Sequence, residues 1–461
     1  MNNLKPSLML FALILLATPG VRAQQEEPKG EVPEETNTPG QSGTSAGLKP
    51  DTRPVSGVEE MRVESPGRSR NYVIPSLRVS AFGDSNQTIG AAQTTGFEMS
   101  GNVVGSLAAH RVTRRNDFSL DYSGGGIFYA RNSQPNASMH QMGITETYQG
   151  RRWGITLGDR LSYLPESAFG FGGFGSGVGM GGDFGSWNPV IGSSQTVFSG
   201  RGPRISNNGL VQVQYNASAR STLTLAGSFA ILRFKEPGFV ESNFSFGTVG
   251  YNYALNRKDT VSVSYGFGAI RFLGSPFHID SHYGQISYGR RVTGRLAFLV
   301  AGGPQFVISR SPAVGSTNKL DWTAHTSLDY ILGRSSLNWS YAHYTSNGSG
   351  LFFGAKTDNF SGSFSNRLTR NWTWSIAPGY TRNTTLRGGP SVISASAFNS
   401  VYGSTSFNRN LGRYTDLAFS YTLHDQWSDA LSPNGINEGS SYLRHFLSVS
   451  LTWHTARLGL N

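Results

Sequence analysis

One short segment of the chain places a histidine, a serine and an aspartate at alternate positions. These residues are His325, Ser327 and Asp329, and together they are the side chains of a serine hydrolase. In a β-strand, alternate residues share one face. Neighbours on one face lie about 7 Å apart, however, which strains a direct Ser–His hydrogen bond within one strand. A hydrolase is therefore an alternative, and a polar wall is the simpler interpretation.

Other chemistry finds less support in the sequence. His343 and His445 are predicted to face the other way without an acid partner, and the nine histidines form no metal-spaced cluster with carboxylates. The chain has no cysteine, which excludes thiolate catalysis. Residues 170–175 match G-x-G-x-x-G, but the strand and helix that a nucleotide site needs are missing around them. We expect no cofactor, no metal and no enzyme activity.

The elements that position these residues are short segments that alternate apolar and polar side chains from residue 72 onward. In residues 417–424, Leu417, Phe419, Tyr421 and Leu423 share one face and polar or small residues share the other. The same pattern recurs in 261–268, 336–341 and 447–453, but it is blurred around Tyr251 and Tyr283. Strands have this period of two. The sequence predicts an all-β fold of about 18 strands, each of roughly 9–13 residues.

The breaks between these segments alternate in kind. Short turns, nearly all carrying arginine, fall near residues 111–115, 150–152, 218–220, 256–259, 293–295, 332–334, 369–371 and 411–413. One longer Gly-, Ser- and Asn-rich loop lies between each pair of turns. The pattern predicts nine up-and-down pairs of antiparallel strands, with both chain termini on the short-turn side.

The first residues look like a secretory signal, with Lys5, a short apolar run and a small-residue cleavage site near Ala23. We assign residues 1–23 to the signal peptide, 24–70 to a disordered linker rich in Glu and Pro, and 71–461 to the barrel. The net charge is +11, and 32 of the 39 basic residues are arginines, since only seven are lysines. They are scattered along the chain, which argues against nucleic-acid binding.

Tryptophans favour a membrane over a soluble sandwich. Five of the eight, Trp153, Trp339, Trp372, Trp374 and Trp453, lie within a few residues of a short turn, as in an aromatic girdle. With the strand rhythm and the arginine turns, residues 72–461 resemble bacterial outer-membrane β-barrels, most closely the porin-like ones. The resemblance implies an up-and-down transmembrane barrel in the cell outer membrane, with short periplasmic turns and longer extracellular loops. Its partners would be outer-membrane lipids and the barrel-assembly machinery.

One feature departs from that class. Such barrels usually finish on a strand with a terminal aromatic, whereas here the last segment, 443–453, is followed by a tail, 456–461. Either the assembly signal is internal, or assembly tolerates the tail.

Two groups of residues could control what passes through such a barrel. If the strand phase is right, the inward positions include Arg78, Asp121, Arg160, His325, Asp329 and Arg444. They form either an eyelet with some anion preference or a wall of salt bridges. The long Gly-rich loop, 166–208, either folds inward as a constriction or stays outside. Its candidate constriction residues are Gly170, Phe171, Phe174, Gly175, Phe184 and Trp187.

The favoured function is passive diffusion of small polar or anionic solutes through an outer-membrane channel. The alternatives are a barrel-embedded hydrolase and a structural or polysaccharide-export barrel. A transporter with a plug domain is disfavoured, because residues 24–70 are too short and polar to fold as one. The sequence leaves open whether the barrel is a monomer or a homo-oligomer.

Overall fold

The structure is a computed structural model that describes residues 71–85, 97–130, 135–166, 201–312, 315–386, 397–428, 441–456 and 458–459. These residues all belong to one compact unit, Thr38–Asn461. The predicted signal peptide, 1–23, and the predicted linker, 24–70, lie outside the described ranges, so both assignments stay predictions.

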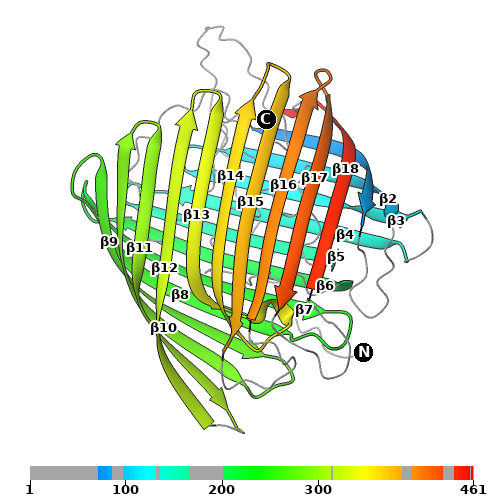
Figure 1. Ribbon diagram of the computed structural model, residues 1–461. Coiled ribbons are helices and arrows are strands. Elements are labelled where there is room, and N and C mark those ends of the chain that lie inside the picture. Colours follow the sequence, from blue (N-terminus) through cyan, green and yellow to red (C-terminus); the bar gives the residue numbers. More distant parts are fainter. Residues whose placement is uncertain are drawn as a thin grey trace, which may run out of the picture. The chain divides into compact units, whose positions relative to one another are not determined.

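The described residues form eighteen long strands and one very short one (Figure 1). Their bounds are β1 (Tyr72–Asp84), β2 (Glu98–Val112), β3 (Asn116–Tyr129), β4 (Ala137–Gln149), β5 (Trp153–Glu166), β6 (Arg201–Asn216), β7 (Ser221–Phe234), β8 (Ser242–Ala254), β9 (Asp259–Phe272), β10 (His278–Thr293), β11 (Leu296–Ser311), β12 (Gly315–Leu332), β13 (Ser335–Ser346), β14 (Ala355–Arg367), β15 (Trp372–Thr385), β16 (Ala397–Asn410), β17 (Thr415–Ser428), β18 (Ser441–His454) and β19 (Leu458–Gly459). A single 3₁₀ turn, η2 (Gly348–Gly350), lies between β13 and β14.

Each long strand pairs antiparallel with the next, and β1 pairs with β18 from Ser76↔His454 to Asp84↔Phe446. The sheet is therefore a closed 18-strand barrel, which confirms the predicted fold class. Closure leaves no free sheet edge at the seam between the first and last strands. The long strands run from 12 residues in β13 to 18 in β12; five of the eighteen fall within the predicted 9–13 residues, and the other thirteen are longer. Several extend beyond the length needed to cross a bilayer.

The two ends of the barrel differ. Short turns at residues 113–115, 150–152, 217–220, 255–258, 294–295, 333–334, 368–371 and 411–414 join the strands at one end, the turn end. This end, at the top of Figure 1, also holds the last strand's carboxyl end. The eight turns lie where the sequence predicted them. The connections at the opposite end, the loop end, include the 3₁₀ turn.

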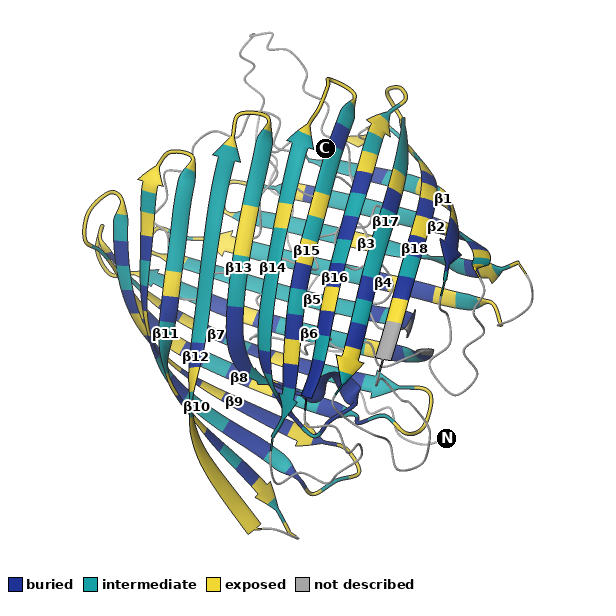
Figure 2. Ribbon diagram, viewed as in Figure 1, coloured by how far each residue is buried: buried dark blue, intermediate teal, exposed yellow. Residues whose placement is uncertain are grey.

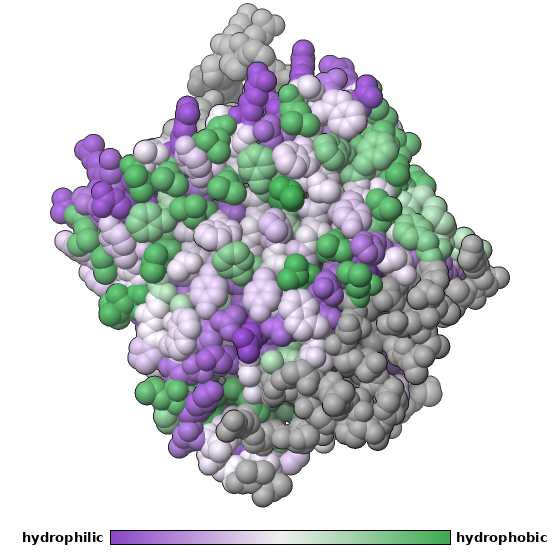
Figure 3. All heavy atoms as spheres, viewed as in Figure 1, coloured by the Kyte–Doolittle hydropathy of each residue, from purple (hydrophilic) through white to green (hydrophobic). Residues whose placement is uncertain are grey.

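The two faces of the wall are inside-out relative to a soluble protein. On β9, Ser262 and Ser264 are 3% and 8% exposed, whereas Val263 and Tyr265 between them are 57% and 51% exposed. Figure 2 shows this alternation of buried and exposed residues along the strands. In Figure 3, apolar and pale side chains cover the middle of the visible wall, and hydrophilic ones gather along the turn end. An apolar outer band and a polar interior are typical of a membrane barrel.

The chain's tail completes the seam. After β18, Leu458 and Gly459 form β19, which pairs with Val73 and Tyr72 at the start of β1. The sequence suggested that residues 456–461 form a tail beyond the barrel. Two of them, Leu458 and Gly459, instead extend the pairing along β1.

The Gly-rich loop is shorter than predicted. β5 continues to Glu166 and β6 begins at Arg201, so residues 201–208 are strand rather than loop. The sequence did not indicate this strand because Gly202, Pro203, Asn207 and Asn208 have low strand propensity. Their pairing with β5 overrides weak local strand propensity, for example through the Ser162–Ser206 hydroxyl contact of 2.6 Å.

Candidate functional site

The barrel wall splits between β12 and β13 near the loop end. β12 pairs with β11 along its whole length from Gly315, but it pairs with β13 only from Ala324 to Leu332. β13 and β14 remain paired with each other up to Ser346↔Ala355. The end of the β13–β14 hairpin therefore leaves the wall while the β11–β12 hairpin continues beyond it.

The hairpin turns toward the inside of the barrel. The Thr345 hydroxyl donates to the Gln305 amide oxygen at 3.3 Å, and Gln305 lies on the inner face of β11. Two residues further on, Asn347 donates from Nδ2 to the Ser242 hydroxyl of β8 at 3.0 Å. The Val240 amide then donates to the Gly350 carbonyl at 2.8 Å. The hairpin thus passes inside β11 and reaches the loop end of β8.

The tip of the hairpin, residues 347–354, touches two walls. The Phe353 ring packs against Phe272 at the end of β9, with ring centroids 5.1 Å apart. The Phe352 ring packs against Phe398 at the start of β16, at 4.8 Å. β9 and β16 are seven strands apart along the sheet. The tip therefore bridges distant walls across the loop end, and we call it the bridging tip.

Glycine makes this route sterically feasible. Gly350 has a φ of +87° and Gly354 a φ of +84°, which L side chains rarely adopt. A Cβ on Gly350 would lie 2.2 Å from the Phe234 ring, and one on Gly354 would lie 2.2 Å from the Ile279 methyl. Both positions therefore require glycine for their backbone conformation and for close approach to the wall.

The place where the wall splits is filled by a charged and aromatic junction. His343, 2% exposed, meets Asp358 through Nδ1 at 2.6 Å and Asp321 through Nε2 at 3.9 Å. The Trp322 ring stacks on His343 with centroids 4.0 Å apart, and Lys356 donates to Asp321 at 2.9 Å. The prediction that His343 lacks an acid partner is wrong, because Asp358 comes from the next strand and Asp321 from the previous one.

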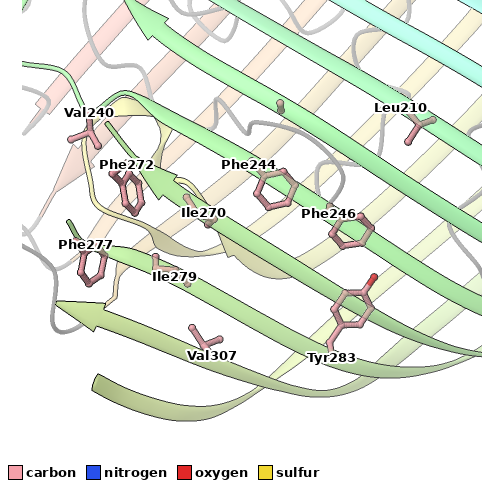
Figure 4. Close-up of a cluster of buried hydrophobic side chains, with 11 residues drawn as sticks. Leu210, Val240, Phe244, Phe246, Ile270, Phe272, Phe277, Ile279, Tyr283 and Val307 are labelled. Carbon is pink, nitrogen blue, oxygen red and sulfur yellow. The ribbon is translucent and has the colours of Figure 1, made fainter. Parts of the chain in front are cut away.

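Apolar side chains line the inner wall where the tip lies. Phe244 and Phe246 of β8, Tyr283 of β10 and Val307 of β11 are each 2–6% exposed and belong to one cluster (Figure 4). Phe353 of the bridging tip packs against this cluster. A second inner cluster spans the β1–β18 seam and includes Phe82 of β1, Ile127 of β3 and Phe446 of β18. The loop half of the interior thus holds two apolar clusters beside buried polar groups such as the Asp84–Arg444 pair.

Two of the six predicted inward charges lie at the seam. Arg78 of β1 donates from Nε to the Thr452 hydroxyl of β18 at 3.0 Å. Arg444 of β18 faces Asp84 of β1, with Nε 3.0 Å from each carboxylate oxygen, and the two side chains are 3% and 1% exposed. Both arginines are therefore engaged in joining the first and last strands.

The other four predicted charges lie on two facing stretches of wall. Asp121 of β3 and Arg160 of β5 both pair with Gly143 of β4, so they flank a residue without a side chain. Arg160 Nε lies 3.9 Å from where a Gly143 Cβ would be. His325 and Asp329 lie on β12, nine strands from β3 in a ring of eighteen. Asp121 is exposed, and Asp329 accepts from Asn338 at 2.5 Å.

These residues define a polar turn half of the interior. Asp121, Arg160, His325, Asp329 and Asn338 are partly or fully exposed, unlike the buried Arg444. We call them the polar vestibule. The predicted constriction residues Gly170, Phe171, Phe174, Gly175, Phe184 and Trp187 lie outside the described residues, so their role stays a prediction.

The bridging tip was missed in the sequence. Its signal is the run Leu351-Phe352-Phe353 enclosed by glycines in a loop. Three consecutive apolar residues in an exposed loop are unfavourable, so they indicate a segment packed against something.

The structure contains a Ser–His hydrogen bond of the kind that a hydrolase needs, but a substrate does not have access to it. Ser400 of β16 and His424 of β17 form a hydrogen bond of 2.7 Å between Oγ and Nε2. The two residues are only 1% and 2% exposed, however, and they face the interior. A lipid substrate outside the barrel does not reach this pair.

Within the described ranges, no helix has both the length and the apolar character to cross a membrane. In the same part of the chain, no three His, Cys, Asp or Glu side chains are grouped as metal ligands.

No family model matches the chain, and no curated protein matches it. Several solved structures are similar. Pseudomonas aeruginosa OccK2 (OpdF), in complex with glucuronate, has a TM-score of 0.43 and 10% identity over 83% of this chain and 98% of that chain. Acinetobacter baumannii OccAB3 has 0.41 and 12%, over 84% and 99%. P. aeruginosa OpdK with vanillate has 0.39 and 8%, over 83% and 98%. At such scores the fold rests on the strand pairing described above.

Proposed function

We propose that this protein is an outer-membrane channel for passive diffusion of small polar or anionic solutes. Support comes from the closed 18-strand wall with an apolar outer face, since barrels of 16–18 strands leave an aqueous interior. Short turns face the periplasm in such barrels, so the turn end would lie on the periplasmic side and the loop end on the extracellular side. Outer-membrane lipids and the barrel-assembly machinery are the partners that this location requires.

The observation that carries the proposal is the change of character along the interior. A solute entering from outside would first pass the bridging tip and the apolar clusters, and would then reach the polar vestibule. Asp121, Arg160, His325 and Asp329 would replace part of its hydration and set the local field. Because these groups carry both signs, we expect weak rather than strict charge selectivity. The bridging tip would limit the width of the path.

The test is single-channel conductance in a planar bilayer, with the tip shortened. Deleting residues 348–353 joins Asn347 to Gly354 between the paired residues Ser346 and Ala355. An Asn-Gly pair favours a two-residue hairpin turn, so the strands should stay in register. We expect discrete conductance steps from the wild-type protein and larger steps from the deletion variant.

A tethered variant is the matched control. Because the chain has no cysteine, Asn347→Cys with Ser242→Cys gives a background-free pair for a short, cleavable bis-methanethiosulfonate cross-linker. The side chains replaced are 3.0 Å apart at their polar atoms. The cross-linked protein should conduct no better than wild type. A silent bilayer with both wild type and deletion refutes the channel, whereas equal steps from both refute only the tip as constriction.

A further inference from the structure

A row of cationic and hydrogen-bonding side chains crosses the outer face of the wall near the loop end. Asn243 of β8 pairs with Arg271 of β9, which pairs with His278 of β10, which pairs with Arg310 of β11. Arg233 of β7 donates to the Asn243 amide oxygen at 2.5 Å and extends the row. Directly paired residues point to the same face. Arg233 joins the four paired residues through its contact with Asn243, so the five side chains form one surface. We call it the arginine row.

Asp280 holds two of the arginines in place. Arg271 meets one of its carboxylate oxygens at 2.7 Å, and Arg310 meets the other at 3.1 Å. Arg271 also donates to the carbonyls of Ile270 and Ile279 at 3.1 and 3.2 Å. The arginine side chains remain 48% and 51% exposed. The guanidinium groups are therefore fixed in position while part of each faces outward.

The row carries more positive charge than its neighbours neutralise. Arg233, Arg271 and Arg310 contribute three positive charges, and Glu241 and Asp280 contribute two negative ones, which leaves +1. A guanidinium has five N–H donors, and the Arg310 contact with Asp280 uses one of them. Donors of this kind bind phosphate in a fork, with better geometry than lysine gives.

Tyrosines mark where the membrane ends below this row. Five outward tyrosines lie on strands that run from the turn end to the loop end. The hydroxyl of each forms a hydrogen bond with a polar residue of the next strand, nearer the loop end. The pairs are Tyr122–His140, Tyr265–His282, Tyr341–Asp358, Tyr380–Asn399 and Tyr421–His445, at 2.7–3.1 Å. Tyrosine with its polar end toward water is typical of a membrane interface.

The arginine row lies just beyond that interface. On β9, Arg271 is six residues beyond Tyr265 and twelve beyond Asp259 at the turn end. An apolar band about 25 Å tall needs roughly ten residues of a strand tilted by about 40°. Counting from Asp259, the band ends near Ala269, so Arg271 lies at the level of the lipid headgroups.

We propose that the arginine row binds the phosphate groups of a phosphorylated glycolipid in the outer leaflet. The inference rests on the outer-membrane location in the proposed function, and it is independent of conduction. A phosphate on a saccharide headgroup fits the charge, the fixed arginine forks and the depth of the row. The lipid's acyl chains would lie along the apolar residues below, such as Val263 and Ile286, which are 57% and 64% exposed.

The experiment is native mass spectrometry of the detergent-purified full chain, titrated with a bisphosphorylated glycolipid and with its dephosphorylated form. Wild type should bind the phosphorylated lipid more tightly. Arg271→Gln with Arg310→Gln should weaken that binding by about tenfold or more, because both guanidinium forks that would hold the phosphate are removed. Excess inorganic phosphate should compete poorly if the intact lipid is the ligand.

The matched control removes two outer-face arginines at the turn end, Arg290→Gln with Arg409→Gln. Arg290 lies 3.6 Å from Asp259, and Arg409 stacks on Trp372 at 5.3 Å. This variant should bind the glycolipid like wild type. Equal binding of the two lipid forms, or equal loss in both double variants, overturns the proposal. Planar-bilayer steps from the Arg271/Arg310 variant show whether the channel itself is intact.

Discussion

An exposed isoleucine provides the sharpest test of the membrane assignment. Ile286 of β10 is 64% exposed on the outer face, and in a soluble protein its replacement by arginine would be nearly neutral. Leu320 of β12 is even more exposed, at 72%. The two residues differ chiefly in their distance from the turn end of the barrel, and Leu320 also lies on the part of β12 that is not paired with β13.

That distance sets the expected magnitude. Ile286 is seven residues from Thr293 at the end of β10, and Leu320 is twelve residues from Leu332 at the end of β12. A strand tilted by about 40° rises roughly 2.6 Å per residue along the barrel axis. Ile286 therefore lies about 18 Å above the turn end, inside a band about 25 Å tall, whereas Leu320 lies about 31 Å above it. Arginine costs about 2–4 kcal/mol at the midplane of the band, and this cost falls to about 0–1 kcal/mol near the interfaces.

The assay is urea unfolding in lipid vesicles, followed by tryptophan fluorescence. We expect Ile286→Arg to lower the unfolding free energy by about 2–3 kcal/mol and Leu320→Arg to lower it by less than about 1 kcal/mol. In urea, the first change moves the midpoint by about 1–2 M. Equal effects of the two variants would refute the reasoning, because exposure alone would then explain both.

Two further predictions concern the inward charges. Asp84→Asn leaves Arg444 buried without its carboxylate, so this variant should lose about 3–5 kcal/mol of unfolding free energy, and Asp84→Leu with Arg444→Met should lose less. The same vesicle assay measures both variants. If Asp84→Asn loses less than the double variant, the seam interpretation is wrong. In the vestibule, Asp121→Asn should shift the reversal potential in a salt gradient toward anion preference, and Arg160→Gln toward cation preference. If neither variant moves the reversal potential, the vestibule does not contact the permeant ions.

The wall of the barrel was predictable because its pattern is local. Alternation in segments such as 447–453 fixes which side chains share a face, and membrane barrels carry this pattern on every strand. The arginine turns fixed the pairing order, since each is too short to connect anything but neighbouring strands. The same logic placed Arg78, Asp121, Arg160, His325, Asp329 and Arg444 on the inner face, where the structure has them.

What those residues contact was not predictable. Arg444 meets Asp84 across 360 positions of sequence, and no local pattern relates the two. His343 likewise finds Asp358 and Asp321 on its two neighbouring strands, because the wall splits beside it. Register between strands decides such contacts, and alternation alone does not specify register.

The sequence of the wall strands does contain a signal for the bridging tip, because some inner positions near the loop end are apolar. On β8, the inner positions are Phe244 and Phe246 toward the loop end but Thr248 and Asn252 toward the turn end. A pore hydrated along its whole length would keep its inner face polar throughout, since exposed apolar rings gain nothing from water. A strand whose inner face changes from polar to apolar indicates where the interior is filled by protein. Here the apolar stretch belongs to the cluster against which Phe353 packs, so the wall and the tip share one packing arrangement.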